Sequence, residues 1–228
     1  MNSSRGALIS GMSGIVFVIV LVAAFSVAGA RLPPTATAQD IVAYYSQHQG
    51  TLQLAQSLRV LAALVFFVFL ARLWTMLQQA EAGSGERAVA VLAAGVAMPI
   101  MILVVSAARL TLIMHAGEIQ DATVVQLVRD FAQVLETATF YPLAVVVGLG
   151  SWTLAGTRGA PRWIGLVSVA GAILVVAGIV GSLAWPALTG LAMVGLPGFL
   201  AWILAVSIVM TIRAARQADR MKVPAIAR

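Results

Sequence analysis

Long apolar stretches separated by short polar segments dominate the chain. A helix needs about 20 apolar residues to cross a hydrocarbon core of about 30 Å. We therefore expect six spans, near residues 7–30, 54–78, 88–114, 131–156, 163–185 and 189–212. Strands of a membrane barrel would instead alternate in segments of about ten residues. The pattern predicts an all-α polytopic membrane protein, a six-transmembrane-helix bundle that forms one domain over residues 1–228.

The first apolar stretch ends in Ala28-Gly29-Ala30, which fits the cleavage site of a secretory signal peptide. However, it runs from Gly6 to Ala30, much longer than the 7–15 apolar residues of a signal sequence. We expect it to be retained as the first span.

The segment after the first span, RLPPTATAQDIVAYYSQHQG, predicts a short outer helix over residues 38–49. Thr37 can cap this helix, with Asp40 as an acidic variant of the capping box, and Gly50 is a plausible terminator. Helical spacing puts Tyr44 and His48 on one face, and Ile41 and Tyr45 on another. Further along, residues 119–130 are expected to extend the fourth helix outward beyond the lipid.

Composition supports the membrane class, because 61% of residues are hydrophobic and only 10% are charged, against about 25% charged in soluble domains. The net charge of +6 does not indicate nucleic-acid binding, since the basic residues flank the apolar runs. Arg5, Arg87, Arg158, Arg162 and the tail 213–228 would fall on one side of a six-span protein. The positive-inside rule then places both termini in the cytoplasm.

Three ionisable residues from three predicted helices share one layer near the outer hydrocarbon boundary: Arg59, Arg109 and Glu136. The uncharged runs 88–108 and 137–157 fix this depth, because each has 21 residues and so spans about 31 Å. Arginines near helix ends commonly snorkel or fix helix packing. Alternatively, two arginines facing one glutamate leave positive charge for an anion, such as a lipid headgroup or a carboxylate.

Just above this layer we expect Arg129, His115, Tyr44 and His48. A metal or haem at the histidines is disfavoured, because two histidines with scattered acids are too few for a tetrahedral site. Gly117 also interrupts the helix that His115 would share with Glu118. We therefore expect no cofactor and no metal.

Enzyme motifs are missing from the sequence. It contains no HExxH, no GxSxG and no phosphate-binding loop, and it has no cysteine. An acidic residue at mid-depth, which ion-coupled transporters commonly use, is also missing. Small residues recur at helical spacing at Ser10 and Gly14, at Gly171 and Gly178, and at Gly178 and Ser182, which favours close helix packing within the bundle or between copies.

The stretch TAQDIVAYYSQHQGTLQLAQSLRVLAALVFFVFLARLW resembles a large group of bacterial membrane proteins of unknown function. They carry a short outer helix after the first span, followed by an apolar span with an early and a late arginine. The matching positions are Asp40, Ile41, Tyr44, Tyr45, His48, Gly50, Arg59 and Arg72, within residues 1–80; Gln49 departs from a commonly basic position. The resemblance implies a six-helix domain in the bacterial plasma membrane and is silent on activity.

These observations predict a non-enzymatic membrane protein whose outward-facing polar pocket binds an amphiphile or a small anion, as a sensor, carrier or lipid-handling factor. The alternative is an accessory subunit of a larger membrane complex. Membrane lipids are the expected partners, with other subunits or a homo-oligomer as further possibilities and no nucleic acid. The pocket residues we expect are Arg59, Arg109, Glu136, Arg129, His115, Tyr44 and His48.

Overall fold

The computed structural model describes residues 3–29, 32–33, 35–81, 83–119, 121–155, 170–171, 173, 177 and 189–222, and these residues contain helices and no strand. The elements are α1 (Ser3–Ala28), α2 (Ala38–Gln47), α3 (Gln49–Ala80), α4 (Glu86–Met114), α5 (Ala122–Ala138), α6 (Phe140–Ala155) and α8 (Thr189–Lys222). The predicted all-α class is confirmed.

Five helical segments in the described part of the chain are long and apolar enough to cross a membrane. They are Gly11–Ala28, Gln49–Ala80, Glu86–Met114, Ala122–Leu154 and Gly195–Ile212. The predicted fifth span, 163–185, lies outside the described residues except for residues 170, 171, 173 and 177, which are helical. The chain is therefore a multi-pass helical membrane protein.

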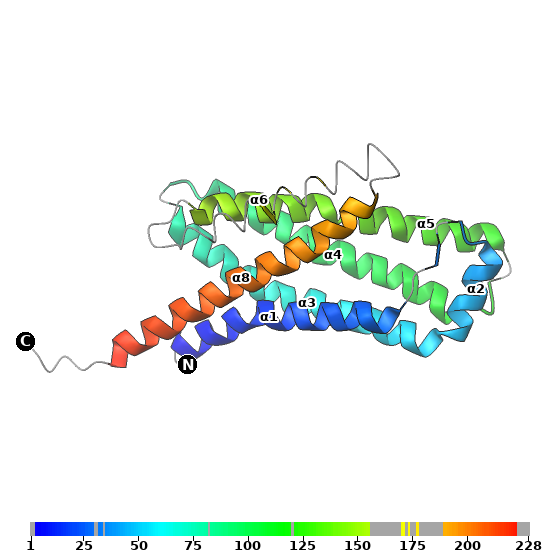
Figure 1. Ribbon diagram of the computed structural model, residues 1–228, viewed down its shortest axis with the longest axis horizontal. Helices are drawn as coiled ribbons and strands as arrows, with labels where there is room; N and C mark the ends of the chain where they lie inside the picture. The colour runs from blue at the N-terminus through cyan, green and yellow to red at the C-terminus, as the bar shows by residue number, and fades with distance from the viewer. Residues whose placement is uncertain are drawn as a thin grey trace, which may run out of the picture.

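The long helices lie side by side along one axis, with α2 across one end (Figure 1). The start of α1 and the end of α8 both lie toward the opposite end (Figure 1). Helix α3 packs between α1 and α4. Helix α8 packs on α1, and both α5 and α6 pack on α4. Many large apolar side chains remain exposed along these helices, as expected for surfaces that face lipid.

Aromatic rings from three helices form the centre of the core. The ring of Phe17 on α1 lies 5.1 Å from Phe66 on α3 and 6.2 Å from Phe199 on α8. Helix α1 approaches closely because residue 14 is glycine: a Cβ there would lie 2.0 Å from Ser207 Oγ and 2.7 Å from the Phe69 ring. Close packing at Gly14 thus serves contacts within the chain.

The outer helix begins as predicted but ends differently. The Thr37 side chain accepts from the Asp40 N–H, and the Asp40 carboxylate accepts from the Thr37 N–H, which confirms the capping box. The prediction that Gly50 ends the helix is wrong, because Gly50 lies in the first turn of α3. His48 separates the two helices with φ −114° and ψ 20°, a conformation that needs no glycine.

The predicted fourth span, 131–156, is divided into two helices. Helix α5 begins at Ala122, where the Asp121 side chain accepts from the Thr123 N–H at 2.8 Å. The prediction that helix precedes residue 131 is therefore confirmed, although the helix starts later than residue 119. A break at Thr139 separates α5 from α6. Pro142 explains the break, because proline has no N–H to bond the carbonyl four residues earlier.

Candidate functional site

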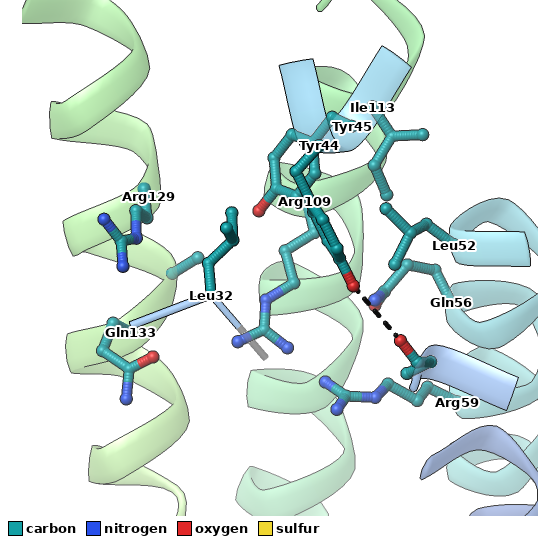
Figure 2. A pocket seen from close by; sticks show the side chains of 12 residues that line it. Leu32, Tyr44, Tyr45, Leu52, Gln56, Arg59, Arg109, Ile113, Arg129 and Gln133 are labelled. Carbon is teal, nitrogen blue, oxygen red and sulfur yellow. Dashed lines mark hydrogen bonds between the residues drawn. The ribbon is translucent and has the colours of Figure 1, made fainter. Parts of the chain in front are cut away.

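A cavity of about 120 Å³ lies where α2 covers the ends of α3, α4 and α5 (Figure 2). Side chains from these helices, the end of α1 and the α1–α2 connection surround it. The lining residues are Ala28, Leu32, Tyr44, Tyr45, Leu52, Gln56, Arg59, Arg109, Ile113, Arg129, Ala132 and Gln133.

Glu136 joins the two arginines that the sequence placed in its layer. Arg109 Nη1 donates to Oε1 at 3.4 Å, and Arg109 Nη2 donates to Oε2, so this contact is bidentate. Arg59 Nη1 donates to the same Oε1 at 3.3 Å. The three side chains are only 7%, 17% and 21% exposed for Arg59, Arg109 and Glu136. One carboxylate therefore connects α3, α4 and α5.

Arg59 also contacts an aromatic ring. Its Cζ lies 4.9 Å from the ring centroid of Phe25 on α1, within the range of a cation–π interaction. Arg59 is thus held between α1 and α5 rather than extended toward water, and its residue surface is 6% exposed.

Arg129 ties α5 to the connection between α1 and α2. Its Nη2 donates to the Pro33 carbonyl at 2.7 Å, and its Nη1 donates to the Ala36 carbonyl at 3.3 Å. These bonds hold the start of α2 over the cavity. The buried contact of Ile41 and Ala38 on α2 with Val125 on α5 supports the same position.

Both tyrosines of α2 line the cavity, although the sequence placed only Tyr44 there. The Tyr44 hydroxyl lies 3.5 Å from the Ala28 carbonyl, to which it can donate. Burial raises the pKa of Tyr45 above 10.0, although the charges of Arg109 and Arg129 oppose the shift. Its phenol stays protonated at neutral pH, and among the described residues its hydroxyl forms no hydrogen bond. Tyr45 is therefore a hydrogen-bond donor facing the cavity.

Gln56 is a second residue that sequence reasoning missed. It is 4% exposed, and its Oε1 is buried with no hydrogen-bond donor in the described part of the chain. Figure 2 shows its side chain beside the tip of Tyr44 and on the same side of the cavity as Leu52. Its position on α3 was the available signal, because Gln56 lies at helical spacing between Leu52 and Arg59, which also line the cavity.

The two histidines do not line this cavity. His48 is exposed, with its ring 4.6 Å from that of Tyr44 and its Nδ1 3.0 Å from the Tyr44 carbonyl oxygen. His115 follows the end of α4 and pairs with Glu118 at 2.7 Å, where both side chains are mostly exposed. Across the described ranges, no group of three or more histidines and acids could hold a metal.

Among the described residues, the cavity lining holds three guanidinium groups and neutral donors, and the carboxylate of Glu136 binds two of these guanidinium groups. Arg59, Arg109 and Arg129 carry three positive charges, and Glu136 supplies one negative charge. The apolar part of the wall consists mainly of Leu32, Leu52 and Ile113 (Figure 2). Such a lining suits a small anionic group attached to an apolar part. The chain matches no protein-family model, no curated protein and no solved structure.

Proposed function

We propose that this protein is a six-span membrane protein, with both termini in the cytoplasm of a bacterium, that binds an anionic amphiphile or small anion in this cavity. The cavity would then face the outside of the plasma membrane, because α2 lies at the end away from the start of α1 and the end of α8 (Figure 1). Binding rather than chemistry is the role, as a sensor, carrier or lipid-handling factor.

The charge balance at the cavity is the observation that carries the proposal. The described lining and its bonded carboxylate hold three arginines against one glutamate. Taking arginines out of water is costly unless anions or dipoles compensate them. The Pro33 and Ala36 carbonyls accept hydrogen bonds from Arg129, and an anion in the cavity would be a further acceptor for the guanidinium groups that line it.

The size of the cavity limits what it can enclose. A cavity of about 150 Å³ can hold benzene, and this one measures about 120 Å³. It therefore fits a headgroup or a compact organic acid, and any long acyl chain would extend outside. A phosphate headgroup and a free phosphate share the chemistry that the arginines recognise.

Native mass spectrometry of the protein extracted gently from its host membrane tests the proposal. We expect a bound small mass in the unmodified protein, its loss in Arg109→Gln and its retention in Glu136→Gln. Arg72→Gln is the matched control, because Arg72 lies on α3 but does not line the cavity. A mass retained by folded Arg109→Gln protein would contradict the proposal.

Reconstitution distinguishes the two sources of the anion. Nanodiscs made of zwitterionic lipid, with and without an anionic phospholipid, report on a headgroup, and added inorganic phosphate reports on a free anion. We expect one of the two, the anionic phospholipid or the phosphate, to stabilise the unmodified protein against heat and to have no such effect on Arg109→Gln. The alternative role, an accessory subunit, stays a prediction, as does the family resemblance.

A further inference from the structure

Gln56 on α3 brings a polar group into the cavity wall that the described residues leave without a partner. The residue is 4% exposed, and its Oε1 is buried and accepts no hydrogen bond from any described residue. A buried acceptor that has lost water and gained no donor destabilises a fold. Native proteins satisfy such groups with protein atoms, ordered water or a ligand. Because Gln56 lines the cavity, its missing donor belongs to a molecule inside the cavity.

The guanidinium groups of the wall do not supply this donor, because their hydrogen bonds go to other acceptors. Arg59 follows Gln56 on the same helix, yet its Nη1 donates to Glu136 at 3.3 Å. Arg109 makes its bidentate contact with the same carboxylate, and Arg129 donates to two backbone carbonyls. A charged donor bonds a carboxylate more strongly than a neutral amide, so the amide oxygen is left over.

A second glutamine in the wall shows the difference that burial makes. Gln133 on α5 also lines the cavity, but it is exposed, so water can satisfy its amide. Figure 2 shows the two glutamines on opposite sides of the cavity. Gln56 differs from Gln133 in its access to water and not in its chemistry. Its amide oxygen therefore depends on a donor from within the cavity.

We propose that the anion bound in this cavity carries a hydroxyl group, and that this hydroxyl donates to Gln56 Oε1. The inference rests on the proposed function, because it names the class of anion that the same cavity takes. A carboxylate, a sulfate or a phosphodiester group offers only acceptors, which suit Arg109 and Arg129 but not an amide oxygen. Hydrogen phosphate and a phosphoglycerol headgroup each combine an anionic group with a hydroxyl.

An ammonium group would also supply a donor, but the charge of the cavity argues against it. Residues three apart on a helix have Cβ atoms about 5–6 Å from each other, so a cation at Gln56 would lie near Arg59. The lining holds three guanidinium groups, and Glu136 already binds two of them. Like charges at such short distances repel each other. A hydroxyl provides the donor without adding positive charge.

Two matched pairs of probes test the inference on the full chain in nanodiscs of zwitterionic lipid. Hydrogen phosphate and sulfate are both tetrahedral oxyanions, but only the phosphate keeps a proton at neutral pH. Phosphatidylglycerol and phosphatidylmethanol share a singly charged phosphodiester, but only the first carries hydroxyls. Thermal stability titrated with each probe at constant ionic strength gives its apparent Kd. We expect the hydroxyl-bearing member of one pair to bind about tenfold more tightly, and that pair identifies a free anion or a headgroup as the source.

Gln56→Met is the decisive variant, because it keeps the length of the side chain and removes the amide. It should abolish the discrimination by weakening binding of the hydroxyl-bearing probe about tenfold. Gln133→Met is the matched control and should preserve the discrimination. Removing an unpaired buried acceptor does not cost stability, so unliganded Gln56→Met should melt at or above the temperature of the unmodified protein.

The outcomes separate this inference from the proposed function. Equal affinity within both pairs, with binding still lost in Arg109→Gln, overturns the hydroxyl and leaves an anion site; ordered water then satisfies Gln56. Discrimination that persists in Gln56→Met overturns the assignment of the donor to this residue. Failure of all four probes to bind overturns the proposed function and this inference together. Discrimination that is lost in Gln56→Met and kept in Gln133→Met supports both.

Discussion

Replacing Glu136 with glutamine should destabilise the protein more than replacing either arginine that it contacts. The substitution keeps the shape of the side chain but leaves Arg59 and Arg109 without their shared carboxylate. Removing one partner of a buried ion pair costs about 3–5 kcal/mol. Because Arg109 and Glu136 are 17% and 21% exposed, we expect a loss near the lower end, about 3 kcal/mol.

The comparison with Arg59→Gln makes the prediction specific. In that variant Glu136 keeps its bidentate contact with Arg109, so the loss should be close to one charge-assisted hydrogen bond, about 1.5 kcal/mol. Reversible unfolding in mixed micelles, followed by tryptophan fluorescence, measures both free energies. The reasoning is refuted if Arg59→Gln costs as much as Glu136→Gln, because Glu136 would then not be the shared partner.

Three further predictions concern packing and pH. Gly14→Ala should lower the free energy of unfolding by about 1–3 kcal/mol through overpacking. Gly148→Ala is the control, because a Cβ there meets nothing within 4 Å and should not destabilise the protein by crowding. Equal losses of unfolding free energy in the two variants would refute the first prediction. The hydrogen bonds from Thr37 hold the pKa of Asp40 below 3.8. The stability that they add is therefore present above pH 3.8 and lost as pH falls through the lower folded pKa. Asp40→Asn should remove this acid-dependent loss, and an unchanged pH profile of α2 hydrogen exchange would contradict it. Burial raises the pKa of Tyr45 above 10.0, so ultraviolet titration should show a late phenolate component that disappears in Tyr45→Phe.

The membrane-spanning helices and the level of the charged residues along them could be predicted from sequence, because both follow from counting residues within one helix. A count of 21 uncharged residues at 1.5 Å per residue was enough to place Arg109 and Glu136 at one level. The cap of α2 was equally local, since Thr37 and Asp40 are three residues apart. Such features need no knowledge of how helices rotate against each other.

The remaining parts of the site depend on helix rotation, which the sequence does not specify. Tyr44 and Tyr45 point in different directions from α2, yet both line the cavity because α2 lies across the bundle end. Gln56 turns inward because α3 contacts α1, α2 and α4. Gly50 was misjudged because His48 ends α2 without the left-handed conformation that favours glycine.

The contacts of Glu136 with Arg59 and Arg109 also have a consequence for how the protein is synthesised and inserted. Arg59 and Arg109 precede Glu136 by 77 and 27 residues in the chain. At a synthesis rate of about 5–20 residues per second, Arg59 emerges about 4–15 s before its acid partner. During this interval the inserted α3 must keep its guanidinium in contact with water or anionic lipid. Arrival of α5 then ends this exposure, so the bundle can close only after the ribosome has passed residue 136.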